Sequence, residues 1–270
     1  MARRGEKARR TTPPKIPPNE LAPHPAYGYH LPIMTVEITW AGCLDYALAW
    51  EKQKALIAEL SHHPDRIGDL LLLEHPPTYT LGRNGHIENL LLDEAALKQQ
   101  GITFYRVDRG GDITYHGPGQ LVGYPILNLK TLYSVYSLGL VRRYVHDLEE
   151  LIIQAISSFG LVGQRYENHR GVWIETAAGF AKIAAVGVRI SAGGISSHGF
   201  ALNVSPNMSH FNGIIPCGLP DYAVTSMAEL LGYPLGVDEL LSPIITAFSR
   251  VFDVPTRITT LLKEPDHVLR

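Results

Sequence analysis

The segment 102–129 constrains the fold more than any other part of this chain, because it places a glycine-rich stretch between two runs of strand-forming residues. Aliphatic, aromatic and β-branched side chains dominate both runs, as is typical of strands. The stretch between them contains Gly110, Gly111, Gly117 and Gly119. Glycine adopts backbone conformations that other residues avoid and lets a ligand approach the main chain closely. The segment therefore predicts strand, glycine-rich loop and strand, with the loop as a rigid binding wall; a long turn is the simpler alternative.

The overall composition is that of a globular protein with a sizeable core. The chain has 270 residues, 45% of them hydrophobic, and a formal net charge of −2. This charge argues against nucleic acid as a partner, and no apolar run approaches the ~20 residues of a membrane span. Two cysteines, Cys43 and Cys217, are too few for a disulfide scaffold. We therefore expect a reducing, cytoplasmic location, with neither nucleic acid nor membrane as a partner.

The N-terminal segment 1–26 differs in composition from the rest of the chain. It is rich in Arg, Lys and Pro and has almost no large apolar side chains. Such a segment cannot bury enough surface to fold, and it lacks the apolar stretch of a secretory signal. We expect a disordered, basic, proline-rich extension at 1–26 and one catalytic domain at 27–270.

The rest of the chain predicts helices and strands in irregular succession. Beyond the segment 102–129, strands are expected at 35–40, 70–73, 79–81, 172–175, 183–190 and 200–204. Helices are expected at 44–60, 93–100, 141–159, 221–231 and 238–252. Because the two kinds of element do not alternate regularly and no repeat is present, the predicted fold class is α/β (α+β): a single mixed-sheet domain with flanking helices.

The helix expected at 44–60 has a recognisable apolar stripe. Its members, at helical spacing, are Leu44, Leu48, Ala55, Leu56 and Leu60. This stripe predicts the face that packs against the core. Cys43, at the start of this helix, is most simply interpreted as a small buried hydrophobic residue.

Most familiar catalytic signatures are absent from the sequence. It contains no G-x-x-x-x-G-K-[ST] phosphate loop, no H-E-x-x-H and no C-x-x-C. The segment 194–199 resembles a nucleophile elbow only superficially, because His198 stands where that motif needs glycine. No histidines pair at helical ligand spacing, so we expect neither a metal site nor a cofactor.

Cys217 is the candidate nucleophile, since it lies between Pro216 and Gly218 in a stiff and open turn. A free thiol titrates near about 8.5, so it needs a cation or a helix N-terminus to become a thiolate. The candidate partners are Lys182, His116 and His198. Lys182 opens an apolar strand, where an inward charge would be unusual; a solvated lysine at a strand end and a structural cysteine are the simpler alternatives. Spacing alone leaves both open.

Several short motifs follow one another in a fixed order between about residues 74 and 227. They are 109–120 (RGGDITYHGPGQ), 170–173 (RGVW), 182–187 (KIAAVG), 198–204 (HGFALNV), 216–218 (PCG) and 224–226 (VTS). Taken together, they resemble the lipoyl(octanoyl) transferase family, the octanoyl-[acyl-carrier-protein]:protein N-octanoyltransferases of lipoate biosynthesis. Any one motif alone would be weak, whereas their common order is specific.

The resemblance implies a fold shared with biotin and lipoate protein ligases. It implies that Cys217 takes the octanoyl chain from octanoyl-acyl carrier protein as a thioester and that Lys182 lowers the pKa of this thiol. The chain would then pass to a lysine of the lipoyl domains of 2-oxoacid dehydrogenase E2 subunits or of the glycine-cleavage H protein. The implied substrate pocket is lined by Arg109, Gly110, Gly111, Asp112, Ile113, Thr114, Tyr115, His116, Ala185, Val186, Gly187, Gly199, Phe200 and Ala201.

The chemistry of such a transfer agrees with the missing phosphate loop, because exchange between thioesters needs neither ATP nor a metal. An ammonium near Cys217 would favour the thiolate, and after acylation the same lysine could act as general base. Backbone N–H groups near Gly199 could hold the oxyanion. We expect Tyr115, Val186 and Phe200 in an apolar slot for the acyl chain. His116 either aligns the acyl group or only braces the loop.

Two alternatives remain open from the sequence. An ATP-dependent lipoate or biotin protein ligase of the same fold would keep Lys182 but would not need Cys217. A non-catalytic module that binds an acyl carrier would need neither. Because carrier proteins and lipoyl domains are typically acidic, a basic surface is expected, with Arg142, Arg143 and Arg189 as candidates.

Overall fold

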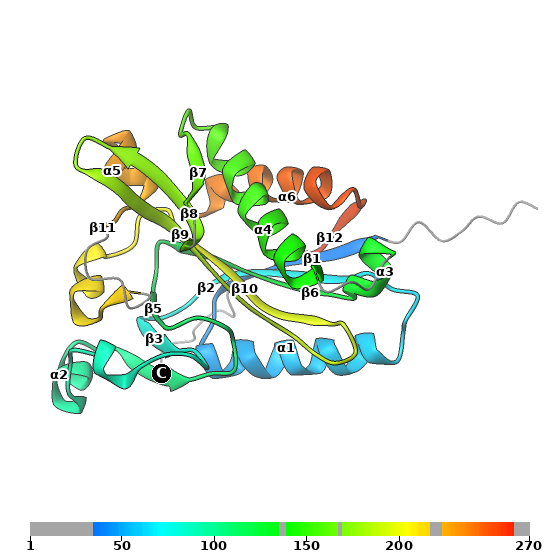
Figure 1. Ribbon diagram of the computed structural model, residues 1–270, viewed down its shortest axis with the longest axis horizontal. Helices are drawn as coiled ribbons and strands as arrows, with labels where there is room; N and C mark the ends of the chain where they lie inside the picture. Colours follow the sequence, from blue (N-terminus) through cyan, green and yellow to red (C-terminus); the bar gives the residue numbers. More distant parts are fainter. Residues whose placement is uncertain (1–34, 135–138, 167–168, 217–222, 262–270) are drawn as a thin grey trace, which may run out of the picture. The chain divides into compact units, whose positions relative to one another are not determined.

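The computed structural model describes residues 35–134, 139–166, 169–216 and 223–261 (Figure 1). The predicted extension 1–26 and the candidate nucleophile Cys217 lie outside these ranges. Among the helices within them, none is long and apolar enough to cross a membrane.

A large mixed sheet forms the centre of the described domain and confirms the predicted fold class. Its strands are β1 (Val36–Cys43), β2 (Gly68–Glu74), β6 (Gln120–Leu127), β7 (Gly163–Tyr166), β8 (His169–Thr176), β9 (Gly179–Ile190), β10 (Ser196–Asn203), β11 (Ala223–Val224) and β12 (Thr256–Leu261). They are ordered β12-β1-β2-β6-β10-β9-β8-β7, with β11 added beside β9. The pairs β12–β1, β1–β2 and β11–β9 are parallel, and the other pairs are antiparallel.

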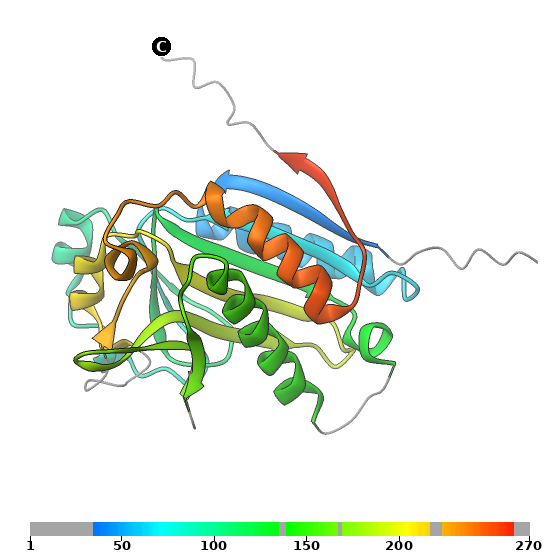
Figure 2. The same cartoon turned by 90° about the horizontal axis from the view of Figure 1, so that it is seen from above.

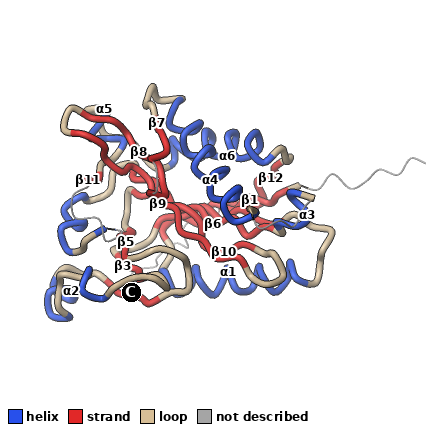
Figure 3. The backbone as a smooth tube through the Cα atoms, in the orientation of Figure 1, coloured by secondary structure: helices blue, strands red, loops and turns tan. Residues whose placement is uncertain are grey.

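A second, small sheet corrects the prediction of one uninterrupted glycine-rich loop. It consists of β3 (Thr78–Leu81) between β4 (Thr103–Arg106) and β5 (Ile113–His116), and Figure 3 shows it apart from the large sheet. Strand β5 lies inside the predicted loop, where four consecutive buried residues separate the two pairs of glycines. The strands on either side of the loop, β4 and β6, therefore belong to different sheets.

Helices cover both faces of the large sheet (Figures 1 and 2). The helices of the described residues are α1 (Tyr46–Ser61), η1 (Ile87–Asn89), α2 (Glu94–Gln99), α3 (Leu129–Tyr133), α4 (Leu140–Ser157), η2 (Met208–Gly213), α5 (Met227–Leu231) and α6 (Asp238–Phe252). Helices α4 and α6 pack on one face and share the main hydrophobic core with the sheet. Helix α1 packs on the opposite face over a smaller core.

Helix α1 exists as predicted, but its buried face coincides only in part with the predicted stripe. Asp45 caps its first turn by accepting hydrogen bonds from the backbone N–H groups of Ala47 (2.8 Å) and Leu48 (3.3 Å). The buried residues of the helix are Tyr46, Ala49, Gln53 and Leu60. Of the predicted stripe, Leu60 is buried and Leu44 and Leu56 pack against the smaller core, whereas Leu48 and Ala55 are exposed. Cys43 is exposed at the end of β1, which corrects the prediction of a buried residue.

The C-terminal third shows two further corrections. The helix expected at 221–231 begins only at Met227, because Ser226 and Glu229 form a capping box there, and the short strand β11 precedes it. Strand β12, which pairs with β1 at the edge of the sheet, was not predicted. Helix α6 has the predicted bounds, but it continues through Pro243, where the sequence predicts an interruption.

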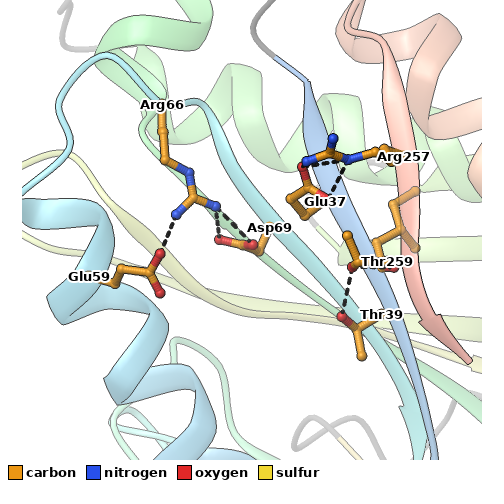
Figure 4. A network of polar contacts seen from close by, with 8 residues as sticks. Glu37, Thr39, Glu59, Arg66, Asp69, Arg257 and Thr259 are labelled. Carbon is orange, nitrogen blue, oxygen red and sulfur yellow. Dashed lines mark hydrogen bonds and ion pairs between the residues drawn. The ribbon is translucent and has the colours of Figure 1, made fainter. Parts of the chain in front are cut away.

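Polar side chains join the strands at this edge (Figure 4). Arg257 Nε on β12 donates to Glu37 Oε1 on β1 (3.0 Å), and the hydroxyl groups of Thr39 and Thr259 are 3.5 Å apart. Arg66 donates to both Asp69 on β2 (3.1 Å) and Glu59 on α1. The pair of Arg257 and Glu37 lies at the surface, whereas that of Arg66 and Asp69 is partly buried.

Candidate functional site

A cavity of about 640 Å³ lies where the glycine-rich segment meets β9 and β10. The predicted site residues that line it are Arg109, Gly110, Gly111, Asp112, Ile113, Thr114, His116, Lys182, Ala185, Val186, Gly187, Gly199, Phe200 and Ala201. Residues of the lining that lie outside the predicted pocket are Tyr46, Asn84, Tyr124, Val141, Val145, His169, Arg170, Val188 and His198. Of these, His198 was predicted from the sequence as a candidate partner of Cys217. The fold thus gathers the separate motifs around one space.

The glycines at this wall allow two parts of the chain to approach one another. Gly110 N donates to Val188 O (2.9 Å), which lays the glycine-rich segment across β9. A Cβ atom at Gly187 would lie 3.0 Å from Gly110 O, and one at Gly199 would lie 2.1 Å from Gly123 O. The predicted close backbone approach is therefore present, but in the described residues it is the protein's own backbone that approaches.

Lys182 is buried within β9, with 7% of its surface exposed. Its ammonium nitrogen lies 4.6 Å from the centroid of the Trp173 ring on β8, a distance at which a cation and an aromatic face attract one another. On its other side Lys182 pairs with Val224 of β11, and Lys182 O accepts from Thr225 N (3.0 Å). The alternative of a solvated lysine at a strand end is therefore wrong.

Arg109 brings a second buried positive charge to the cavity. Its Nη2 donates to the carbonyl and to the hydroxyl oxygen of Thr80, at 2.6 and 2.9 Å, and its Nη1 donates to Gly110 O (3.0 Å). These three oxygens are neutral acceptors that orient the guanidinium in the cavity wall. Burial has the largest influence on the pKa of His116, His198 and Tyr46, and the charge of Arg109 acts to lower the pKa of all three.

His116 is held from both ring nitrogens. Its Nδ1 lies 2.9 Å from Gln120 Oε1, and its Nε2 lies 3.2 Å from Thr80 Oγ1. Because the amide oxygen can only accept, Nδ1 carries the proton and Nε2 accepts from the hydroxyl group. Burial lowers the pKa of His116 well below its ordinary value, so the ring is neutral. Of the two roles left open by the sequence, these contacts favour bracing of the loop.

His198 is the most unusual residue of the lining. It has φ of +57°, a region that residues other than glycine seldom adopt. Its backbone N–H donates to Gln53 Oε1 (2.8 Å) on α1, and its Nε2 lies 2.8 Å from Asp108 Oδ1. Asp108 also pairs with Arg189 (3.0 Å). The contacts with Gln53 of α1 and with the carboxylate of Asp108 thus hold His198 in a backbone conformation that would otherwise be disfavoured.

The pKa shifts of His198 and Asp108 agree with a neutral histidine and an ionised aspartate. Burial lowers the pKa of His198, although the hydrogen bond to Asp108 acts in the opposite direction. Burial acts to raise the pKa of Asp108, but the contacts with His198 and Arg189 outweigh it and lower the pKa. Arg189, a candidate for a basic docking surface, is thus already paired with an acid.

The comparisons with known proteins agree with this geometry. Residues 45–249 match the family model of the lipoyl protein ligase A/B catalytic domain. The chain belongs to this family. An octanoyltransferase from Chloroflexus aurantiacus is 43% identical over 228 residues, which cover 84% of this chain and 98% of the relative. One from Rubrobacter xylanophilus is 43% identical over 79% of this chain and 92% of the relative. The resemblance predicted from the motifs is confirmed.

Solved structures of this ligase family share the fold at low sequence identity. A bipartite lipoate protein ligase from Thermoplasma acidophilum superposes with a TM-score of 0.64 at 16% identity, over 85% of this chain and 88% of that one. A lipoate-protein ligase A bound with ATP gives a TM-score of 0.62 at 14% identity, over 85% and 90% of the two chains. The predicted lipoate-ligase-like fold is therefore confirmed.

Two tyrosines at the α1 side of the cavity, Tyr46 and Tyr124, were not predicted as lining residues. Tyr124 on β6 hydrogen-bonds through its hydroxyl to His75 Nε2 (2.7 Å), and His75 Nδ1 donates to Leu44 O (2.7 Å). Burial lowers the pKa of His75 to about 4 and raises that of Tyr46 to about 12. The sequence did contain a hint of their role, since both tyrosines place a hydroxyl group in a segment that was expected to be buried.

Tyr115 is the one predicted pocket residue of the described part that does not line the cavity. Alternate side chains of a strand point to opposite sides, and in β5 it is Thr114 and His116 that line the cavity together with Ile113. Tyr115 instead packs with Tyr79 and Ile214 in a separate small core. The apolar slot keeps Val186 and Phe200 but not Tyr115.

Proposed function

We propose that this protein is an octanoyltransferase of lipoate biosynthesis. It moves an octanoyl group from octanoyl-acyl carrier protein to Cys217 and then to a lysine of a lipoyl domain or of the glycine-cleavage H protein. The observation that carries the proposal is Lys182, buried in the wall of a cavity that the family's motifs build together. Octanoyltransferases at 43% identity, matched over nearly their full length, support the same activity.

The burial of Lys182 gives it a chemical task. A buried ammonium attracts a negative group strongly, because little water lies between the two charges to screen them, and a thiolate at Cys217 would be such a group. The thiolate attacks the thioester carbonyl of the donor, the bond from the carbonyl to the carrier's sulfur breaks, and the carrier leaves as a thiol with a proton from Lys182. The now neutral lysine is a base at the reacting carbonyl.

The second half of the cycle returns this proton. The amine of the acceptor lysine attacks the octanoyl thioester, gives a proton to Lys182, and releases Cys217 as the thiolate. The donor already carries the acyl group as an activated thioester, so both acyl exchanges can proceed without ATP. Cavity-lining glycine N–H groups are the candidate donors to the oxyanion.

The cavity suits an acyl chain in size and in lining. Its volume of about 640 Å³ lies within the ~300–1,000 Å³ usual for ligand sites. Val186, Phe200 and Val145 offer apolar surface. Full burial of the chain would contribute at most roughly 0.8 kcal/mol per CH₂. A lipoyl domain as the acceptor is supported by a structural analysis of an archaeal lipoylation system, which covers a lipoate protein ligase of the same fold and its E2 lipoyl domain.

The test separates a transferase from a ligase by its acyl donor. Purified protein and an apo lipoyl domain receive either octanoyl-acyl carrier protein without nucleotide, or free octanoate with ATP and Mg²⁺. We expect the lipoyl domain to gain one octanoyl group only from the carrier. Transfer only from octanoate with ATP would make the protein a ligase. Carrier binding without transfer, unchanged in Cys217→Ser, would make it a binding module.

A further inference from the structure

The glycine-rich segment has a second face, directed away from the cavity. Tyr115 on this face is completely buried. Its ring meets the rings of His210 and Phe211 nearly at right angles, with centroids 5.1 and 5.3 Å away. Its hydroxyl lies 2.7 Å from His210 Nδ1, within hydrogen-bond distance. Residues 210 and 211 belong to η2, which in the sequence leads towards Cys217.

A second tyrosine holds the same point of η2. The hydroxyl of Tyr79, on the neighbouring strand β3, donates to the backbone carbonyl of His210. The rings of Tyr79 and Tyr115 are themselves in edge contact, with centroids 5.9 Å apart. His210 is therefore held through its side chain by one tyrosine and through its backbone by the other.

Two glycines make room for these hydroxyl groups. A Cβ atom at Gly117 would lie 1.9 Å from the hydroxyl oxygen of Tyr115, and one at Gly213 would lie 2.4 Å from that of Tyr79. Neither distance is possible without movement of the tyrosine ring or the backbone. Gly117 of the family motif is thus required by Tyr115, whatever the cavity holds.

The chain after η2 is also tied to this platform. Gly213 O accepts from Leu91 N (2.9 Å), and Ile215 N donates to Asn89 O (2.8 Å). The side chain of Asn89 in turn donates to Asp112, which lines the cavity. The backbone is thereby fixed up to a residue two positions before Cys217.

We propose that Tyr115 is a positioning residue for the transfer, acting through its hydrogen bond to His210. The bond holds η2 and residues 214–216 against the small sheet, so that one segment of the chain both walls the cavity and orients the approach to Cys217. The inference rests on the proposed function of Cys217. It assigns to Tyr115 a role other than the substrate contact predicted from the sequence.

The test removes only the hydroxyl group, with Tyr115→Phe. The matched control is Tyr144→Phe, since the buried hydroxyl of Tyr144 donates to Pro125 O (3.2 Å) in the main core, away from η2. Formation of the octanoyl-enzyme from octanoyl-acyl carrier protein is followed by quenched-flow mass spectrometry. We expect Tyr115→Phe to slow this step about five- to tenfold, the usual effect of one lost hydrogen bond, with the carrier concentration for half-maximal rate unchanged. Tyr144→Phe should keep the wild-type rate.

Cys43, the other cysteine of the chain, is exposed and supplies an internal reference for thiol labelling. The ratio of iodoacetamide labelling at Cys217 to that at Cys43 should change in Tyr115→Phe but not in Tyr144→Phe. A double variant with His210→Ala should lose less than the sum of the two single losses, since both changes remove the hydrogen bond between Tyr115 and His210.

Two results would overturn the inference. One is an octanoylation rate and labelling ratio in Tyr115→Phe equal to those of the wild type. The other is an equal loss in both tyrosine variants that follows their melting temperatures. If the wild type forms no octanoyl-enzyme at all, the proposed function fails, and an unchanged labelling ratio then decides against Tyr115 independently.

Discussion

Two polar regions of this protein differ in how their charges meet water. At the outer edge of the large sheet, Glu37 and Arg257 form an ion pair at the surface, and the side chain of Arg257 is 70% exposed (Figure 4). Around the cavity, the charged side chains of Lys182 and Arg109 are almost fully buried, and so is the neutral ring of His198. Exposed ion pairs exchange one hydrated state for another and contribute little. Buried charges lose their hydration, so the fold retains them at a cost in stability.

The polar groups at the edge are therefore dispensable for the fold, whereas those around the cavity are held in place by it. The edge could lose its charges and keep its strand pairing, because the backbone ladder of β1 and β12 does not depend on them. The cavity could not lose its polar groups in this way, because Gln53 and Asp108 help to hold His198 in its unusual backbone conformation. The comparison therefore predicts large functional effects at the cavity and small effects of any kind at the edge.

The largest effect is expected at Lys182. Lys182→Met keeps a long side chain beside Trp173 but removes the charge and the base, so octanoyl transfer should fall at least a hundredfold, within the ~10²–10⁴ attributed to a general base. Stability should stay equal or rise, because a buried charge is replaced by an apolar group. Single-turnover transfer and thermal unfolding measure the two quantities.

The exposed Lys98 on α2 provides the control, since Lys98→Met removes the same charge outside the lining of the cavity. Transfer by Lys182→Met at more than a tenth of the wild-type rate would contradict the comparison, because the buried charge of Lys182 would then have no large role in the reaction.

An effect of intermediate size concerns pH and the buried histidines. Burial lowers the pKa of His75 to about 4 from its ordinary 6.5, so below pH 6.5 the unfolded chain binds a proton that the folded chain refuses. The free energy of unfolding should therefore fall as the pH drops from 6.5 to about 4, by about 3 kcal/mol at most from this residue. Denaturant unfolding at several pH values in this range measures the slope.

The slope should become shallower in His75→Gln and remain unchanged in His63→Gln, which alters an exposed histidine. An equal slope in the wild type and His75→Gln would show that the buried histidine does not carry the pH dependence.

The smallest effect is expected at the edge. Glu37→Gln removes the carboxylate that pairs with Arg257 and leaves the hydrogen-bonding shape almost intact. The melting temperature should shift by no more than about 2 °C, and the transfer rate should not change. A shift above roughly 5 °C, or a loss of activity, would mean that this surface pair is coupled to the core.

The sequence predicts the glycine-rich wall of the cavity better than the side formed by α1. Gly110, Gly187 and Gly199 stand in recognisable local patterns, so their place could be predicted. Tyr46 could not be placed, because its position depends on how α1 is rotated. His198 was a candidate from the sequence, but its backbone angle could not be predicted because tertiary contacts impose it.

The fold shows the same division between local and distant causes. Helix α6 was predictable from its own periodicity. Strand β12 was not, because its partner β1 lies more than two hundred residues earlier in the chain. Tyr115 illustrates the remaining difficulty: a motif residue can serve the reaction from the side of the strand that faces away from the cavity.

The most direct test of the account is the intact mass of the protein after incubation with octanoyl-acyl carrier protein. The account predicts one octanoyl adduct, labile to hydroxylamine, on the wild type and none on Cys217→Ser. Equal adducts on both proteins would remove Cys217 as the acyl site and direct attention to Cys43. No adduct on either, under conditions where the lipoyl domain becomes octanoylated, would mean direct transfer between carrier and acceptor and would contradict the central claim.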